Sequence, residues 1–155
     1  MGLLTFKGGI HPNDGKSLAK DKAIVEVLPE GDLVFPLSQH IGAPAAPIVK
    51  VGDQVLKGQK IAEAGGFVSA PVYSSVSGKV KAIAPYFTPT GGKVSSIIIE
   101  NDGTYTEAER LNTRSLDLIT KEEILNLISE AGIVGMGGAG FPTRVKLSPK
   151  EPEKI

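Results

Sequence analysis

The chain of 155 residues contains no cysteine and has no excess of charge of either sign. Without cysteine it can form no disulfide, and it can hold no thiolate nucleophile, cysteine-ligated zinc ion or iron–sulfur cluster. Its 17 basic and 17 acidic residues give a formal net charge of zero. This balance argues against a nucleic-acid-binding protein, because such proteins carry a clustered basic surface.

Long hydrophobic runs are also lacking. No run reaches the roughly 18 apolar residues that cross a membrane. The first seven residues lack the basic and then apolar regions of a secretory signal. The start Met1-Gly2 fails the myristoylation motif, because residue 6 is Phe. We therefore expect a cytoplasmic protein that is peripheral to a larger assembly.

Glycine and proline are abundant, with 19 and 11 copies, about a fifth of the chain. This exceeds the usual share of roughly 12% and indicates many turns. The chain divides into three zones. Residues 1–40 are mixed, residues 41–100 have the composition of an all-β region, and residues 101–155 contain a polar link, a helix, a glycine cluster and a charged end.

The middle zone has the pattern of a small β-barrel or β-sandwich. Short runs of valine and isoleucine alternate with turn signals every 8–12 residues, as in all-β domains. Residues 49–53 and 76–80 both place a Gly-containing turn beside valines, as two related hairpins would. Residues 48–80 resemble the barrel-sandwich hybrid fold of biotinyl and lipoyl carrier domains. Those carriers present a lysine on an exposed hairpin, whereas residues 63–69 here contain none. A structural β module is therefore favoured over a carrier.

A helix is predicted over residues 121–131. Thr120 and Glu123 form a capping box, in which each side chain bonds the backbone amide of the other residue. Apolar residues follow at helical spacing from Ile124 to Ala131. Gly132 is placed to end the helix in the left-handed conformation.

A glycine cluster follows this helix, with five glycines in residues 132–140. Such a run exposes backbone amides and can form a nest around an anion such as a phosphate. Pro142 suits the first turn of a second helix. Gly135, Gly137 and Gly140 match the dinucleotide-binding pattern G-x-G-x-x-G, but that motif requires a preceding strand, and here a helix precedes it. A flexible linker would favour glycine and serine without the interleaved apolar residues.

Residues 135–143, Gly-Met-Gly-Gly-Ala-Gly-Phe-Pro-Thr, resemble the flavin loop of the NADH-oxidising flavoprotein subunit of respiratory complex I. In that family the loop cradles FMN, and NADH lies over the flavin. The positions that match the family's cofactor-binding positions are Gly135, Gly137, Gly138, Gly140, Phe141 and Lys146. The resemblance implies that the glycines surround the FMN phosphate, that Phe141 stacks on the NADH adenine, and that Lys146 lies near the flavin phosphate. Met136 departs from the pattern, where an arginine often stands.

The rest of the chain resembles the N-terminal region of the RnfC subunit of the Rnf ion-translocating electron-transport complex. The matching segments are residues 6–12, 36–44, 49–53 and 66–71. The resemblance implies a mainly β barrel-sandwich hybrid domain with an N-terminal extension over residues 1–105. It also implies a truncated start of an α/β FMN- and NADH-binding domain over residues 106–155, with a helix at 121–131 and a glycine-rich loop at 132–142.

The family resemblance implies a function for the intact protein. It would transfer electrons between NADH and ferredoxin through FMN and iron–sulfur clusters, coupled to Na⁺ or H⁺ transport by membrane-bound partner subunits. It would lie on the cytoplasmic side of the membrane, with its cluster ligands in a missing cysteine-rich region. This portion alone is expected to be inactive. Two alternatives stay open: an assembly module that docks on membrane subunits, and a swinging-arm carrier.

No catalytic or metal-binding residue is expected in this chain. His11 and His40 are the only histidines, and neither has a second ligand at suitable spacing, so both are interpreted as structural or as contacts between subunits. Asp14 and Asp53 stand beside glycines and are interpreted as turn-forming residues. No nucleophile has a base near it in sequence.

Overall fold

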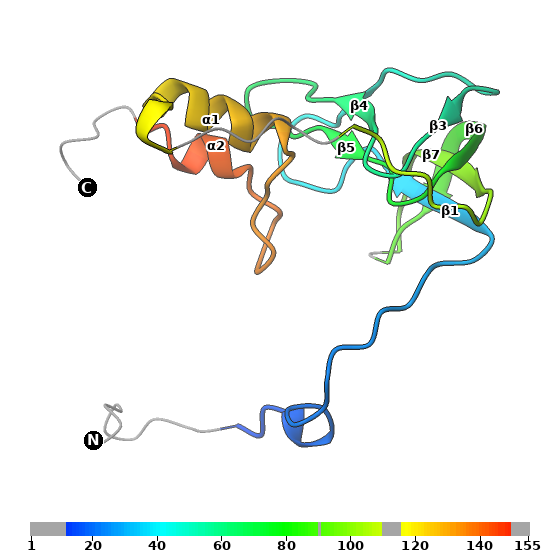
Figure 1. The fold of residues 1–155 in the computed structure, drawn as a ribbon, viewed down its shortest axis with the longest axis horizontal. Helices are drawn as coiled ribbons and strands as arrows, with labels where there is room; N and C mark the ends of the chain where they lie inside the picture. The colour runs from blue at the N-terminus through cyan, green and yellow to red at the C-terminus, as the bar shows by residue number, and fades with distance from the viewer. Residues whose placement is uncertain (1–11, 90, 110–115, 150–155) are drawn as a thin grey trace.

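The computed structural model describes residues 12–89, 91–109 and 116–149. It consists of a β-sandwich, two helices packed beside it, and an N-terminal arm that extends away from both (Figure 1). His11 and most of the segment 6–12 lie outside the described residues.

The larger sheet has four antiparallel strands in the order β1-β7-β6-β3. Their bounds are Asp32–Pro36 for β1, Gln54–Val55 for β3, Gly78–Phe87 for β6 and Lys93–Asn101 for β7. The strands β6 and β7 form a long hairpin in which Val80 lies opposite Ile99. The strand β1 falls in the zone treated as mixed from sequence, so the prediction there missed a strand.

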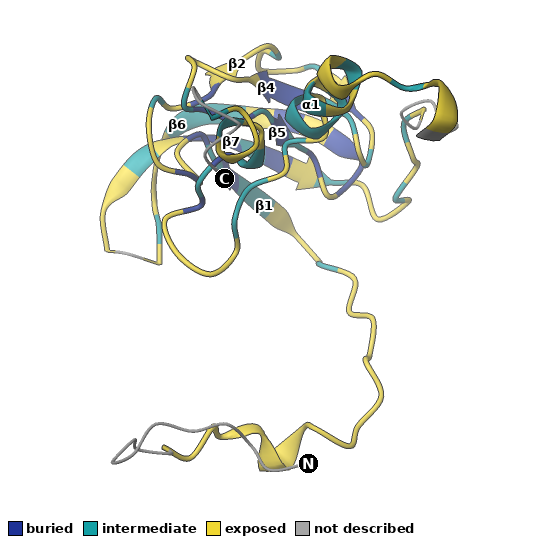
Figure 2. Ribbon diagram, turned by 90° about the vertical axis from the view of Figure 1, so that its left-hand side faces the viewer, coloured by how far each residue is buried: buried dark blue, intermediate teal, exposed yellow. Residues whose placement is uncertain are grey.

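The smaller sheet has three strands in the order β2-β4-β5. Their bounds are Ala46–Pro47 for β2, Lys60–Glu63 for β4 and Val72–Tyr73 for β5. Buried apolar side chains from both sheets and their connections form one core (Figure 2): Phe35, Leu37, Ala45, Val55, Ile61, Ala62, Val72, Val76, Val80, Ile97 and Ile99. The predicted mainly β sandwich is therefore confirmed.

The two similar segments 49–53 and 76–80 do not form two separate hairpins, as their likeness suggested. They contact each other instead: Gly52 N–H donates to the Val80 carbonyl at 2.8 Å, and Val80 N–H donates to the Asp53 carbonyl at 2.9 Å. Asp53 forms the predicted turn, because its carboxylate accepts from Lys50 N–H at 3.0 Å. Gly52 has φ +96°, which glycine adopts without strain.

The predicted helix is α1, Lys121–Glu130, one residue shorter than expected because Ala131 is its C-cap. Both hydrogen bonds of the capping box are present, and Gly132 follows with φ +65°. Short 3₁₀ turns occur at Leu116–Leu118 and Lys16–Leu18. The second helix, α2, is one turn long, Thr143–Lys146. No residue of either α-helix is fully buried within the described structure.

The arm comprises residues 12–28, all of them exposed (Figure 2). It joins the sandwich at Pro29, whose carbonyl accepts hydrogen bonds from Asn101 Nδ2 at 2.7 Å and from the Tyr105 hydroxyl at 2.5 Å. Beyond this anchor the arm continues outward from β1 (Figure 1).

Candidate functional site

The glycine-rich segment after α1 folds into a closed loop. Val134 and Pro142 form an antiparallel bridge across its base. Gly135 N–H donates to the Phe141 carbonyl at 2.9 Å, and Thr143 N–H donates to the Ile133 carbonyl at 3.0 Å. Residues 135–141, which we call the glycine loop, therefore have fixed ends and a tip that projects from the body (Figure 1).

The tip of the glycine loop is open to solvent. Met136 is 99% exposed, and a Cβ placed on Gly137 or Gly138 would meet no atom within 4 Å. The amides of residues 136–138 donate no hydrogen bond to another described residue. A run of amides without partners that includes two successive glycines has the composition of an anion-binding nest.

The far side of the glycine loop packs against the sandwich. Gly140 is buried with φ +63°, and a Cβ there would lie 2.8 Å from the Gln39 carbonyl oxygen and 3.0 Å from His40 Cα. Ile41 N–H also donates to the Ala139 carbonyl at 2.8 Å. Close backbone packing thus explains why a glycine stands at position 140, without any ligand.

An open groove of about 610 Å³ lies between the glycine loop and residues 38–41. The groove is open to solvent along its length, unlike the concave pockets that enclose most of a small molecule. The groove is lined by the loop itself and by the edge of the sandwich, so both parts of the chain contribute to it.

The remaining predicted positions lie at the base of the loop. Phe141 is half-buried and Lys146 is exposed. A Cβ placed on Gly135 would lie 3.8 Å from Lys146 Nζ, so this ammonium group stands beside the loop. Pro142 is the N-cap of α2 and not a residue of its first turn, contrary to the prediction. Since α2 has only four residues, its dipole adds little to anion binding.

His40 has a structural role, in line with the interpretation from sequence. Its side chain is 8% exposed. Its Nε2 accepts from Ala70 N–H at 3.0 Å, and its Nδ1 lies 3.1 Å from the Ile41 carbonyl oxygen, to which it donates in the neutral tautomer. In the described part of the chain no group of three His, Cys, Asp or Glu residues is placed to hold a metal ion.

Residues 63–69 correspond to the hairpin that carries a lysine in biotinyl and lipoyl domains, and here they pack closely against residues 43–44. Ala43 N–H donates to the Val68 carbonyl at 3.0 Å, and Gly65 N–H donates to Ser69 Oγ at 2.9 Å. A Cβ on Gly65 would lie 2.0 Å from the Pro44 carbonyl oxygen. This hairpin lacks the lysine that a swinging-arm carrier needs.

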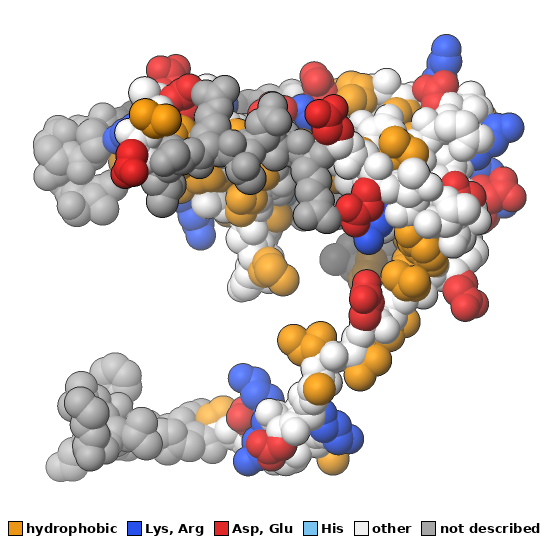
Figure 3. Space-filling model, viewed as in Figure 1, with side chains coloured by type: hydrophobic (Ala, Val, Ile, Leu, Met, Phe, Trp, Pro, Cys, Tyr) orange, Lys and Arg blue, Asp and Glu red, His pale blue; other side chains and the backbone are white. Residues whose placement is uncertain are grey.

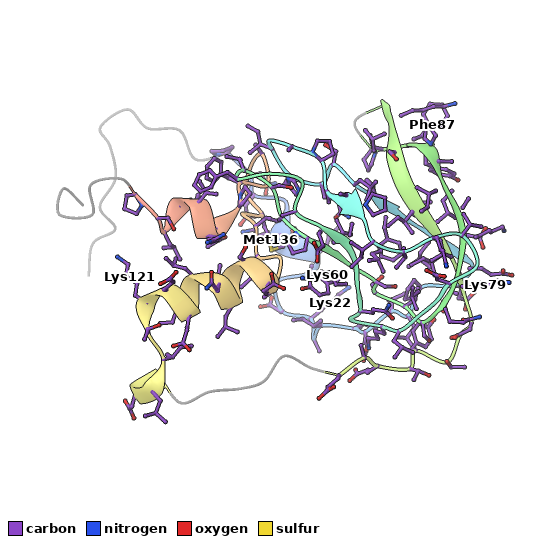
Figure 4. All side chains as sticks on the ribbon, turned by 90° about the horizontal axis from the view of Figure 1, so that it is seen from above. Lys22, Lys60, Lys79, Phe87, Lys121 and Met136 are labelled. Atoms are coloured by element: carbon purple, nitrogen blue, oxygen red, sulfur yellow. The ribbon has the colours of Figure 1, made fainter. Side chains whose placement is uncertain are left out.

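A polar clamp, formed by Lys60, Tyr73 and Glu130, joins α1 to the sandwich. Lys60 Nζ donates to Glu130 Oε2 at 2.5 Å, and the Tyr73 hydroxyl donates to the Glu130 backbone carbonyl. Figure 4 shows Lys60 beside the C-terminal end of α1, whereas Lys121 lies at its other end. Sequence reasoning missed this clamp, because its residues are 57 and 70 positions apart and belong to no local motif.

The clamp changes the titration of two of its members. The hydrogen bond to Glu130 raises the pKa of Lys60 above 10.5, against a smaller opposing effect of burial. Burial raises the pKa of Tyr73 above 10.0. Both shifts keep protons on the two donors, so the clamp is fully formed at neutral pH.

No helix in the described residues has the length and apolar character to cross a membrane. Comparison with known proteins gives one family match: the RnfC barrel sandwich hybrid domain matches residues 4–104. This is the part of the chain that contains all seven strands of the two sheets.

Several relatives match nearly the whole chain. The C subunit of the proton-translocating ferredoxin:NAD(+) oxidoreductase complex of Clostridium ljungdahlii is 48% identical over 155 residues, 99% of this chain and 34% of the relative. The C subunit of the Na(+)-translocating complex of Acetobacterium woodii is 42% identical over 152 residues, 97% of this chain and again 34% of the relative. The corresponding subunit of the ion-translocating oxidoreductase complex of Klebsiella pneumoniae is 42% identical over 144 residues, 92% of this chain and 19% of the relative.

The chain thus spans about a third or less of the curated relatives it matches. Those relatives are subunits of multi-subunit oxidoreductase complexes. The sandwich seen in the structure and the match over residues 4–104 agree on the barrel-sandwich hybrid domain. The chain therefore belongs to the RnfC family and corresponds to an N-terminal portion of this subunit.

Proposed function

We propose that the whole protein transfers electrons between NADH and ferredoxin within a membrane-associated complex that moves ions, using FMN and iron–sulfur clusters. In this proposal residues 1–105 form the barrel-sandwich hybrid domain, and residues 106–155 begin the domain that binds FMN and NADH. The names of the relatives, which are ferredoxin:NAD(+) oxidoreductase subunits, support the reaction class. The chain alone is proposed to be inactive, because its own residues provide no cysteine to ligate a cluster.

The main observation in support of FMN binding is that the tip of the glycine loop is open to solvent. A Cβ placed on Gly137 or Gly138 would meet no atom within 4 Å, so the tip of the loop has open space beside it. The amides of residues 136–138 donate no hydrogen bond to another described residue, and Lys146 adds a positive charge at the loop base. Amide donors and a cation are what a phosphate monoester requires.

The residues of this chain would bind and orient the cofactor and not react with it. The loop amides and Lys146 would hold the FMN phosphate, and Phe141 would offer an aromatic face to the nucleotide. Gly140 and Gly135 would fix the loop ends, through packing on Gln39 and the hydrogen bond to Phe141. FMN, when bound, supplies the hydride and single-electron chemistry.

Titration with FMN tests this proposal, using the whole protein and the 155-residue chain side by side. We expect Gly138→Val in the whole protein to weaken FMN binding at least about tenfold, because its branched side chain blocks the approach to the amides. Gly92→Val is the matched control, since Gly92 is also exposed with open space around its Cβ position. Equal affinity of wild type and Gly138→Val would contradict the assignment of the loop.

An assembly module remains the second candidate for the barrel. The end of the β6–β7 hairpin exposes Tyr86 and Phe87, at 47% and 65%, and Lys93 Nζ lies 4.6 Å from the centre of the Phe87 ring. Figure 4 shows Phe87 at the end of the molecule remote from α1. Exposed aromatic residues are enriched at protein interfaces. If the whole protein binds no FMN, this docking role becomes the better description of the chain.

A further inference from the structure

The N-terminal arm carries a short apolar segment at residues 23–28, Ala-Ile-Val-Glu-Val-Leu, which is uncovered in this structure. Ile24 is 101% exposed, Val25 79% and Val27 81%, and Leu28 is 49% exposed. Only one of its six residues, Glu26, is charged. Singly scattered exposed apolar residues are ordinary, but five apolar residues within six positions mark a contact with something else.

The backbone of this segment is extended and also lacks partners (Figure 1). Its amides and carbonyls make no hydrogen bond to any other described residue. In an extended chain alternate side chains point to opposite faces. Val25 and Val27 then lie on one face, while Ile24 and Leu28 flank Glu26 on the other. This combination is typical of a strand that pairs with a sheet edge and buries one face on it.

In this structure residues 23–28 do not pair with an edge of the sandwich. The arm is tied to it at Pro29, and the exposed residues extend away from the body (Figures 1 and 2). The glycine loop leaves the body on the same side as the arm (Figure 1). Figure 3 shows the hollow between them, bordered by orange apolar groups of the arm and of the loop tip.

We propose that residues 23–28 add as a strand to the part of the same polypeptide that follows residue 155, so that the arm straps the next domain to the sandwich. The proposal rests on the proposed function, in which this chain is the first part of a longer subunit. Two of the relatives it matches are about three times its length, since it spans 34% of each. The tip of the glycine loop points toward the hollow that the arm borders, and α2 then returns to lie beside α1 (Figure 1).

A segment of the same polypeptide fits better than a separate partner. Tethering gives the downstream domain a high effective concentration near the arm, so a segment of this short length suffices for a stable contact. A bare apolar strand without its cover would pair with other copies and promote aggregation. A covering segment that belongs to the same polypeptide prevents this aggregation, because it can bury the apolar strand before the strand meets another molecule.

Hydrogen exchange measured by mass spectrometry tests the strap. We expect the amides of residues 23–28 to exchange at least about tenfold more slowly in the whole protein than in the 155-residue chain. Val27→Asp in the whole protein should abolish this protection. Val51→Asp, at an apolar position on the sandwich that is 60% exposed, is the matched control and should leave it intact. Equal exchange in the two chains would overturn the proposal.

A photo-crosslinking residue at position 25 of the whole protein identifies the occupant. Crosslinks to residues beyond 155 of the same chain support the proposal. Crosslinks to a different protein or to a second copy, or protection that occurs only with anionic lipid vesicles, would overturn it. FMN content of the same samples separates the two proposals: a protected arm without FMN refutes only the flavin assignment, and bound FMN with an unprotected arm refutes only the strap.

Discussion

The sandwich and the α1–glycine loop segment of this chain are stabilised in different ways. The sandwich has a closed core of eleven buried apolar residues from two sheets. The helix α1 has a complete capping box and an apolar stripe, yet none of its residues is fully buried. Local hydrogen bonds fix the form of a helix, but burial of an apolar face provides most of its stability. The sandwich therefore contains the buried core that stabilises it, whereas the α1–glycine loop segment depends for its stability on contacts with other parts of the protein.

The largest expected effect is in the sandwich core. Ile97→Ala should lower the free energy of unfolding by about 2–5 kcal/mol, because it opens a cavity where the side chain is completely buried. Ile98→Ala is the control, since the next residue of β7 is only half-buried, and its loss should be clearly smaller. Urea unfolding followed by far-ultraviolet circular dichroism measures both. Similar losses at the two positions would contradict the assignment of the core.

A medium effect is expected at the start of α1. Thr120→Ala removes both the acceptor for Glu123 N–H and the capping box, which should cost the helix about 1 kcal/mol. Amide exchange of residues 121–131 should accelerate while that of β6 and β7 stays unchanged. Ser38→Ala, an exposed hydroxyl on the sandwich, should alter neither. Faster exchange of β6 and β7 as well would show that the helix and the sandwich unfold as one unit, which would contradict the separate stabilisation of the two regions.

The smallest effect concerns the polar clamp and its pH dependence. In the folded protein the pKa of Lys60 is raised above 10.5 and that of Tyr73 above 10.0. The stabilisation by these two groups is therefore fully present below their ordinary pKa values, and it is lost as the pH rises through their raised pKa values in the folded protein. Attachment of α1 should therefore weaken only above about pH 10. Tyr73→Phe should weaken it at neutral pH by about 0.5 kcal/mol, since Glu130 is exposed to solvent.

Absorbance of tyrosinate at about 295 nm, combined with amide exchange of α1, measures this behaviour. Tyr86→Phe removes an exposed tyrosine that makes no hydrogen bond to α1 among the described residues and serves as the control. An alkaline transition of α1 that is the same in wild type and Tyr73→Phe would show that Tyr73 has no part in it.

The sequence predicted the elements whose structure is determined by interactions between residues that are close together in the chain. The capping box and Gly132 predicted α1 to within one residue, because all of its signals lie between positions 120 and 132. The sandwich followed from turns and β-branched runs, and the turn role of Asp53 from its neighbouring glycine. The strand β1 was missed because turn-forming residues on both sides hide its five residues.

The candidate site was predicted only in part. The glycines of the loop were found from their composition, but the reason for Gly140 is its contact with Gln39 and His40, about a hundred residues away along the chain. The contact between Tyr73 and Glu130 in the polar clamp could not be predicted from the sequence for the same reason. Contacts between distant segments leave no periodic signal in a sequence, so they are found only when the fold is known.

The packing of Gly140 has a consequence for motion. The backbone of Gln39 and His40 occupies the space next to the Gly140 Cα, and the hydrogen bond from Ile41 N–H to the Ala139 carbonyl holds the same two segments together. We therefore expect the base of the glycine loop at residues 139–140 to follow any displacement of residues 39–41, whereas Gly137 and Gly138 at the tip have no such contact. If the proposed flavin site forms on this loop, a partner that displaces residues 39–41 would also displace the end of the loop that is proposed to hold the phosphate.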